Sequence, residues 1–158
     1  MRKNEGFTIF ELLMVIAIIG IISAVAIPNF MSALPRRRLN QAVQELHNDL
    51  QRARLAAVKD RENCAVTFGL SSYTIACTSI NKTVDLSRYG SNVHFERPQG
   101  CSGNVTPAGG ITFTAQGMST INGYAYLTNG VEEEHYRVGA LSSGVVAMDT
   151  HVGGCTWN

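Results

Sequence analysis

The stretch that decides the fold is GFTIFELLMVIAIIGIISAVAIP, residues 6–28 of the 158-residue chain. From Phe7 to Leu34 the only ionisable side chain is that of Glu11. Charged residues make up 16% of the chain, whereas ordinary soluble domains carry about 25%. The apolar segment therefore disfavours a purely cytosolic protein. The net charge of +1 gives no indication of a wholesale nucleic-acid binder.

This segment is compatible with a secretory signal peptide or with a membrane anchor. In a signal peptide, Arg2 and Lys3 form the basic region and Ala24-Val25-Ala26 forms the cleavage site. In an anchor, the 21 residues Phe7–Ile27 are long enough to cross a hydrocarbon core of about 30 Å. The same two basic residues then keep the N-terminus in the cytoplasm.

Glu11 favours a third interpretation, in which the segment is a packing helix of an assembly. A carboxylate inside an apolar core costs roughly 2.5–3.5 kcal/mol on insertion scales, and pairing with a cation makes it tolerable. No Lys or Arg lies within one helical turn of Glu11. A free N-terminal amine created by cleavage nearby would serve as the cation. The amine of a neighbouring copy would also set the register between subunits.

The motif Gly6-Phe7-Thr8-Ile9-Phe10-Glu11-Leu12-Leu13 follows a short basic leader and precedes a long apolar run that contains Pro28. It resembles the N-terminal signal of type IV pilins and of type II secretion pseudopilins. The resemblance implies that a prepilin peptidase removes residues 1–6 by cleaving after Gly6, and that the new N-terminal Phe7 is N-methylated. It also implies that Glu11 pairs with the Phe7 amine of an adjacent subunit during filament assembly.

After Pro35 the apolar residues recur at spacings of four and three, which is the period of an amphipathic helix. They are Leu39, Val43, Leu46, Leu50, Ala53 and Ala57. The other, polar face carries Gln41, Gln44, Glu45, Asn48, Asp49, Gln51, Arg52 and Lys59. Pro28 and Pro35 each remove a backbone donor, so we expect two kinks in one long helix that ends near Asp60–Asn63. Residues 7–34 form its transmembrane or assembly half, and residues 35–63 form its amphipathic half.

Residues 64–158 are predicted to form a β-rich globular domain. Gly and Thr become common there, and the apolar runs shorten to strand length. The predicted strands are Ala65–Phe68, Tyr73–Thr78, Val93–Glu96, Ile111–Ala115, Tyr124–Leu127, Glu134–Ala140 and Val145–Asp149. Turn signals such as Asn129-Gly130 and Ser143-Gly144 separate them. The sequence therefore predicts an α+β fold, in which the long helix packs on a C-terminal antiparallel sheet or pair of sheets.

Two further segments narrow the resemblance. The helix motif Leu46-(x)3-Leu50-Gln51-Arg52-Ala53-Arg54-(x)2-Ala57 resembles the post-anchor helix of the GspH/FimT-like minor pseudopilins. The segment Ile111-Thr112-Phe113-(x)3-Gly117, followed by paired strands and Gly144, is also similar to theirs. DNA-binding members of that family carry basic residues around a glycine–arginine motif near the C-terminus. Here the matching stretch is Gly144-Val145-Val146-Ala147, without arginine, which argues against DNA capture at that site.

Four cysteines, Cys64, Cys77, Cys101 and Cys155, all follow the anchor. None forms a Cys-x-x-Cys pair, so structural zinc is not indicated, and disulfides are expected in an oxidising compartment. Cys64 and Cys77 lie symmetrically about the predicted Leu70–Ser71 turn, which places them opposite each other in a simple hairpin. We therefore predict disulfides Cys64–Cys77 and, by elimination, Cys101–Cys155. The alternatives are the two other connectivities and four free thiols.

Two charge runs lie outside these motifs. Arg36-Arg37-Arg38 follows the anchor, where it is interpreted as a solvated helix turn, a contact to anionic lipid head groups or a DNA contact. Glu132-Glu133-Glu134 is expected to be a solvated acidic turn, with a contact to Arg36–Arg38 of another subunit as the alternative. The four histidines are scattered. No motif indicates a metal, a cofactor or a catalytic site, so the sequence does not predict an enzyme.

These features together predict a structural subunit: a minor pilin or pseudopilin of a type IV filament that serves type II protein secretion or type IV pilus biogenesis. The resemblance implies a single-pass precursor in the bacterial inner membrane, with its C-terminal domain in the periplasm and later in a periplasmic or extracellular filament. Its partners are then other pilin or pseudopilin subunits, the prepilin peptidase and the inner-membrane assembly platform.

Two alternative functions remain at this stage. One is a DNA-uptake minor pilin that binds DNA through Arg36–Arg38, Arg52, Arg54 or Arg61. The other is an exported or membrane-anchored domain whose leader only resembles the pilin motif, which would be cleaved after Ala26 or not at all.

Overall fold

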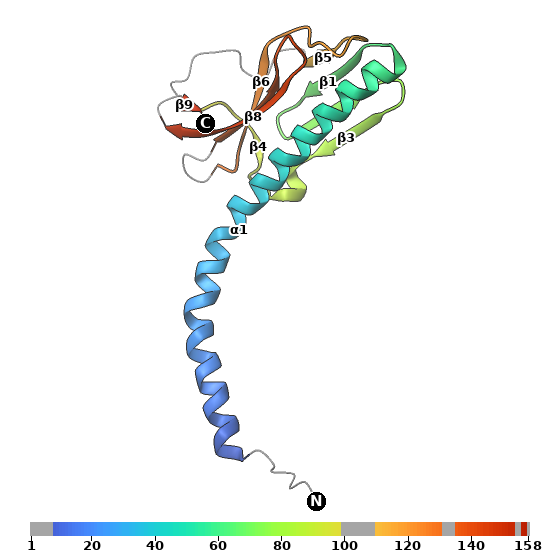
Figure 1. The fold of residues 1–158 in the computed structure, drawn as a ribbon. Helices are drawn as coiled ribbons and strands as arrows, with labels where there is room; N and C mark the ends of the chain where they lie inside the picture. Colours follow the sequence, from blue (N-terminus) through green and yellow to red (C-terminus); the bar gives the residue numbers. More distant parts are fainter. Residues whose placement is uncertain (1–7, 99–109, 131–134, 154–155, 158) are drawn as a thin grey trace, which may run out of the picture. The chain divides into compact units, whose positions relative to one another are not determined.

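The computed structural model describes residues 8–98, 110–130, 135–153 and 156–157. The chain forms two compact units, residues 1–35 and residues 36–158, and each is described by itself. One long helix, α1 (Ile9–Asp60), runs through both units and is followed by a β-rich domain (Figure 1). The elements after α1 are β1 (Cys64–Phe68), β2 (Ser72–Ala76), β3 (Asn81–Asp85), the 3-10 helix η1 (Leu86–Tyr89), β4 (His94–Phe95), β5 (Ile111–Phe113), β6 (Gly123–Thr128), β7 (His135–Ala140), β8 (Val146–Gly153) and β9 (Thr156–Trp157).

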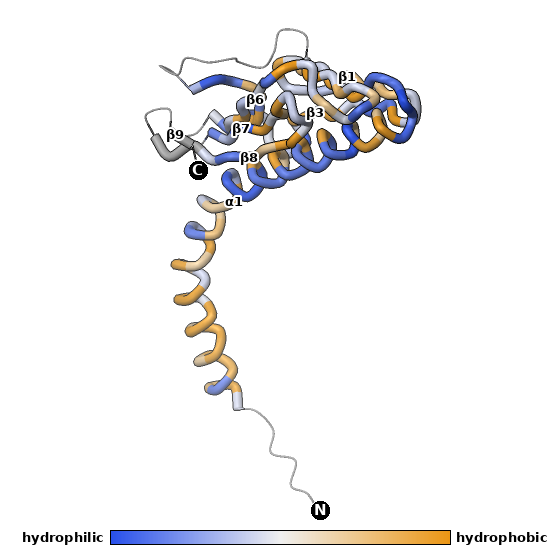
Figure 2. The backbone as a smooth tube through the Cα atoms, turned by 45° about the horizontal axis from the view of Figure 1, so that its top comes forward, coloured by the Kyte–Doolittle hydropathy of each residue, from blue (hydrophilic) through white to orange (hydrophobic). Residues whose placement is uncertain are grey.

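The first half of α1 is apolar on every side. Thr8 caps the helix, because its hydroxyl accepts the backbone N–H of Glu11 at 3.2 Å. From Ile9 to Met31 the large apolar side chains are 45–81% exposed, and Figure 2 shows this stretch as predominantly hydrophobic, with a few hydrophilic positions. Pro28 and Pro35 both lie inside the helix. A helix that is apolar all round requires an apolar environment, which this chain alone does not supply.

The second half of α1 buries the predicted stripe. Leu39, Val43, Leu46, Leu50, Ala53 and Ala57 are each at most 1% exposed. The helix ends at Asp60, as the sequence predicted. The prediction for Asp49 was wrong, because this carboxylate was placed on the polar face and is only 1% exposed. Hydrogen bonds from Tyr73 and Lys82 make that burial tolerable.

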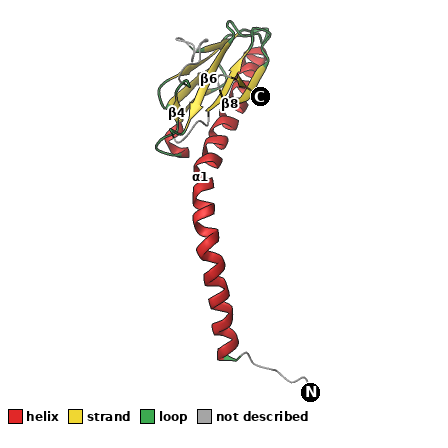
Figure 3. Cartoon of the chain, turned by 90° about the vertical axis from the view of Figure 1, so that its left-hand side faces the viewer, coloured by secondary structure: helices red, strands yellow, loops and turns green. Residues whose placement is uncertain are grey.

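The β-rich domain contains two antiparallel sheets (Figure 3). The first has the strand order β3-β2-β1-β5, and the second has the order β4-β6-β7-β8-β9. In the β1–β2 hairpin, Ala65 faces Ala76 and Phe68 faces Tyr73, so the register is centred on the Leu70–Ser71 turn as predicted. The fold class is confirmed in its α+β form, with a pair of antiparallel sheets.

Strand β3 was missed by the sequence analysis. Its five residues, Asn-Lys-Thr-Val-Asp, include one buried apolar side chain, that of Val84. The strand lies at the edge of its sheet and pairs with β2 alone among the described strands. An edge strand can form with little alternation of apolar and polar residues. Such a strand therefore lacks the pattern by which strands are predicted from sequence.

A single hydrophobic core joins α1 to both sheets. The first sheet contributes residues such as Val66, Ile75 and Phe113, and the second contributes Leu127 and Val138. The rings of Phe68 on β1 and Phe95 on β4 meet edge to face at 5.4 Å and link the two sheets. Among the described residues, every buried hydrophobic side chain lies at position 39 or later. Residues 36–158 therefore contain the complete described core.

The Cys64–Cys77 disulfide is confirmed, with the two Cα atoms 4.4 Å apart. It closes β1 against the end of β2, and Cys64 is fully buried. The second predicted pair, Cys101–Cys155, lies outside the described residues and stays a prediction.

Removing the confirmed bridge is expected to destabilise the domain. The bridge spans 13 residues, a loop size for which the chain-entropy model gives about 3 kcal/mol. The double variant Cys64→Ala with Cys77→Ala should lose about that much in denaturant unfolding of residues 36–158. The oxidised wild-type fragment is the control, and an unchanged unfolding midpoint in the double variant would contradict the prediction.

Candidate functional site: the apolar helix and the β-rich domain

Glu11 occupies the third helical position of α1 and is exposed. Thr8 and Glu11 have the spacing of a capping box, and Thr8 satisfies the backbone N–H of Glu11. The carboxylate therefore lies in the first turn of the helix, where the positive end of the helix dipole favours a negative charge. Gly6, the predicted cleavage residue, and Phe7, the predicted N-methylated residue, lie outside the described residues.

α1 is long and apolar enough to cross a membrane by length and composition. In its apolar half, residues 9–34, Glu11 is the one ionisable side chain. A carboxylate at such a position marks a functional site by default, because it is expensive to bury without a partner. Among the described residues, no group of three or more His, Cys, Asp or Glu side chains could hold a metal ion.

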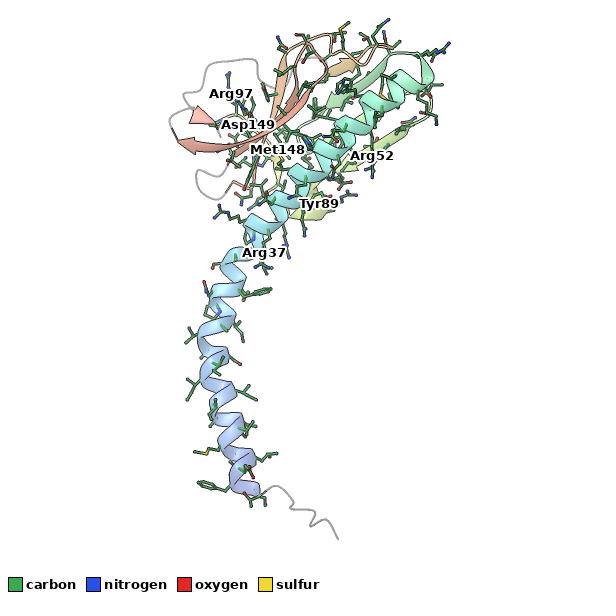
Figure 4. All side chains as sticks on the ribbon, viewed as in Figure 1. Arg37, Arg52, Tyr89, Arg97, Met148 and Asp149 are labelled. Carbon is green, nitrogen blue, oxygen red and sulfur yellow. A yellow bond between two sulfur atoms is a disulfide. The ribbon has the colours of Figure 1, made fainter. Side chains whose placement is uncertain are left out.

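Arg36, Arg37 and Arg38 are exposed on α1 (Arg37 is labelled in Figure 4). They belong to the second unit, together with the β-rich domain. Their exposure leaves the sequence-based interpretations of this run open.

A charge network fastens the second half of α1 to the first sheet. Asp49 accepts a hydrogen bond from the Tyr73 hydroxyl at 2.7 Å and one from Lys82 Nζ at 2.7 Å. Lys82 also donates to Glu45 Oε1 at 3.0 Å, and Arg88 of η1 donates to the other oxygen of Glu45. The helix is thus joined to β2, β3 and η1 by hydrogen bonds in which at least one partner is charged, which are the stronger kind.

The network sets the protonation states of its members. Burial, followed by the hydrogen bond to Asp49, raises the pKa of Tyr73 far above its usual value, so its hydroxyl remains a donor. Burial alone would raise the pKa of Glu45, but the hydrogen bonds and charges of Arg88 and Lys82 outweigh it and hold that pKa below its ordinary value. Burial opposes the charged form of Lys82 too, yet its two carboxylate partners raise its pKa.

The depressed pKa of Glu45 predicts a loss of stability in acid. Its contribution is fully present above the ordinary carboxyl pKa of 4.5 and disappears as the pH falls through the lower folded-state value. The variant Glu45→Gln should therefore be less stable than wild type by about 1.5–3 kcal/mol at pH 7, the range for a hydrogen bond to a charged group. The difference should shrink below pH 4.5, measured by urea unfolding of residues 36–158 at several pH values. A difference that stays constant down to the acid transition would exclude this role of Glu45.

Gly117 and Gly144 lie next to each other beneath α1. Arg54 donates from Nε to the carbonyl of Gly117 at 3.0 Å. Gly144 has φ +79°, and a Cβ there would lie 1.9 Å from that same carbonyl oxygen. Gly117 has φ +75°, and its Cβ would lie 2.8 Å from Val58. Only glycine fits at both positions, so two distant turns can pack together under the helix.

The Asp49 network was not predicted, although the sequence contains a signal for it. Ala42 and Ala56 lie seven residues on either side of Asp49 and share its flank of the helix. Both alanines are buried. Small residues two turns away on each side indicate that this flank approaches another element closely.

Both the N-terminal segment and the domain that follows it match known protein families. Residues 1–27 match the prokaryotic N-terminal methylation motif. Residues 42–144, which contain most of the amphipathic half of α1 and the strands from β1 to β7, match the family described as Type II transport protein GspH. This chain belongs to the GspH family.

Solved structures show the same fold as this GspH-family chain. The type IV minor pilin FimU of Pseudomonas aeruginosa superimposes with a TM-score of 0.55 at 18% identity, covering 72% of this chain and 89% of FimU. The minor pseudopilin EpsH from the type 2 secretion system of Vibrio cholerae gives a TM-score of 0.51 at 13% identity, covering 70% of this chain and 95% of EpsH.

Curated relatives are similar to the GspH-family chain over shorter stretches. PilA4, the type IV wide pilus major component of Thermus thermophilus, is 56% identical over 43 residues, which are 27% of this chain and 31% of PilA4. The type IV major pilin PilA of Myxococcus xanthus is 48% identical over 44 residues, 28% of this chain and 20% of PilA. The matched stretch thus spans about a fifth to a third of the length of these relatives.

These matches identify a structural subunit of the pilin and pseudopilin kind. Proteins of this family and fold are structural subunits, not enzymes. The apolar N-terminal helix and the leader motif fit membrane anchoring, and the family suggests assembly with other pilin subunits.

Proposed function

We propose that this chain is a minor pilin or pseudopilin of a type IV filament assembled at the bacterial inner membrane, where it serves type II protein secretion or type IV pilus biogenesis. The single observation that carries the proposal is Glu11, a lone carboxylate in an exposed apolar helix. The fold supports the minor class, since both structural neighbours are named as minor subunits.

Maturation begins with the leader. A prepilin peptidase cleaves after Gly6 on the cytoplasmic side, and Phe7 becomes the N-methylated N-terminus. Before and after this cleavage the chain crosses the inner membrane once, and its β-rich domain, residues 64–158, lies in the periplasm. That compartment is oxidising, in agreement with the Cys64–Cys77 disulfide.

Assembly then transfers the apolar half of α1 from lipid into a bundle of neighbouring helices. The inner-membrane assembly platform is the partner for this step. Glu11 pairs with the Phe7 amine of an adjacent subunit, so the pair aligns the incoming helix at the depth of its neighbour. The apolar side chains around it lose no favourable environment, because a helix bundle is as apolar as lipid.

Processing of a Gly6→Val precursor tests the proposal. The side chain at position 6 should block the peptidase, so the variant should remain at precursor length while wild type begins at N-methylated Phe7. Gly20→Ala is the matched control, because a Cβ at Gly20 meets no heavy atom within 4 Å. Mass spectrometry of the mature N-terminus gives the readout. Cleavage after Ala26 in the wild-type chain would replace the pilin proposal with an exported domain.

A further inference from the structure

An exposed leucine lies between two open hollows on the domain. Leu55 on α1 is 67% exposed. One hollow, of about 330 Å³, is lined by Gln51, Arg54, Leu55, Val145 and Val146. The other, of about 310 Å³, is lined by Arg52, Leu55, Ala56, Lys59, Ser79 and Ile80. We call the part of these linings formed by Gln51, Arg52, Arg54, Leu55, Lys59 and Val145 the Leu55 surface; Arg54 is partly exposed, and the other five side chains are exposed.

Arg54 is held in place by one of its nitrogens, and its other hydrogen-bond donors remain available. Its Nε donates to the Gly117 carbonyl at 3.0 Å, which fixes the plane of the guanidinium. Its two terminal nitrogens have no hydrogen-bond partner among the described residues. A guanidinium that is already oriented binds a carboxylate with little further loss of side-chain entropy.

The cations that line the two hollows are not paired with carboxylates of the described domain, apart from the approach of Arg52 to Asp49. Arg54 and Lys59 line the two hollows and have no ion-pair partner among the described residues. Arg52 (labelled in Figure 4) approaches Asp49 at 3.6 Å and remains largely exposed.

The face of α1 that carries Leu55 is poor in charge. Exposed side chains recur along it at helical spacing as Gln41, Gln44, Asn48, Gln51, Leu55 and Val58. A solvated helix face is usually rich in Glu and Lys, whereas the centre of a protein interface is depleted in charge. An apolar residue in an uncharged stripe with cations at its rim has the composition of such an interface.

We propose that the Leu55 surface receives a segment of an adjacent filament subunit in which a carboxylate stands beside an aliphatic side chain. This inference rests on the proposed function. The aliphatic side chain packs against Leu55 and Val145, and the carboxylate pairs with the terminal nitrogens of Arg54 or with Lys59. A nucleic-acid strand fits less well, because it offers no aliphatic group to the two hollows and is normally held by stacking and cations.

Site-specific photocrosslinking in the full-length chain tests the proposal. Leu55 is replaced by the photoreactive residue p-benzoylphenylalanine in cells that assemble the filament, and the linked peptide is identified by mass spectrometry. We expect a peptide of another pilin-like subunit, with Asp or Glu next to an aliphatic residue. Leu70 is the matched control, because it is an even more exposed leucine (76%, against 67% for Leu55) outside both hollow linings, and it should not give this product.

Charge variants provide a second, independent readout. Leu55→Glu should lower incorporation into filaments by about tenfold, the effect of losing one interface anchor, while Leu70→Glu should leave incorporation unchanged. Lys59→Glu should lower incorporation as well, and reversing the charge of the captured carboxylate to lysine should restore it. The Leu55→Glu and Lys59→Glu variants should both unfold like the wild-type domain, since the substituted side chains are exposed.

The outcomes separate this inference from the proposed function. Incorporation of the chain without a subunit product at position 55 overturns the inference alone. A product with nucleic acid in place of a subunit overturns it as well and favours the DNA-uptake alternative. Failure of the wild-type chain to enter any filament counts against the proposed function. If, in addition, position 55 gives no crosslink to another pilin-like subunit in the membrane, both the proposed function and this inference are overturned.

Discussion

The variant Glu11→Val should be processed and inserted in the membrane but should enter filaments at least about a hundredfold less than wild type. Removing one partner of a buried ion pair costs about 3–5 kcal/mol, because the other charge stays buried without compensation. Each 1.4 kcal/mol is a factor of ten in an equilibrium constant. The measurement is the ratio of filament-bound to membrane-bound chain, determined separately from cleavage after Gly6.

Two conservative variants show which property of Glu11 matters. Glu11→Gln keeps the size and the helix-capping geometry but removes the charge, so it should resemble Glu11→Val. Glu11→Asp keeps the charge and should retain most incorporation. If Glu11→Gln assembles like wild type, then the carboxylate acts as a capping residue for Thr8 and the pairing with the Phe7 amine is wrong.

The variant Asp49→Ala should lower the free energy of unfolding of residues 36–158 by about 3–5 kcal/mol. The substitution leaves the buried hydroxyl of Tyr73 without an acceptor and removes one of the two carboxylates that bind Lys82. Asp49→Asn should lose less, because its amide oxygen can still accept from Tyr73. Denaturant unfolding with identical slopes for all variants gives the comparison.

Asn48→Ala is the matched control for this series. Asn48 is adjacent in sequence and exposed, so its substitution should change stability by less than about 0.5 kcal/mol. If Asp49→Ala falls in that same range, the charge network does not hold α1 against the first sheet, and apolar packing alone accounts for the domain.

The apolar half of α1 and the buried stripe could be predicted because their signals are local. The repeat Leu39, Val43, Leu46 is set by helical periodicity, and the N-terminal motif lies within a few consecutive residues. The Cys64–Cys77 pair could be predicted as well, since hairpin symmetry about Leu70–Ser71 depends on one turn only.

The parts that could not be predicted depend on distant pairings. Asp49 looks like an ordinary polar residue until Tyr73 and Lys82, which are 24 and 33 residues further along the chain, are placed beside it. Arg54 and the carbonyl of Gly117 are 63 residues apart. A periodic pattern shows which side of an element is apolar, but it does not show which polar group on another element reaches its flank.

The position of Cys64 decides which of the two sulfurs a reagent meets first. In the folded domain this sulfur is fully covered, whereas Cys77 is only half-buried. Thiol–disulfide exchange begins at one accessible sulfur and passes through a mixed disulfide. Redox chemistry on the folded domain therefore enters through Cys77, and Cys64, whose Cα lies 4.4 Å from that of Cys77, is the resolving sulfur that closes the bridge from the inside.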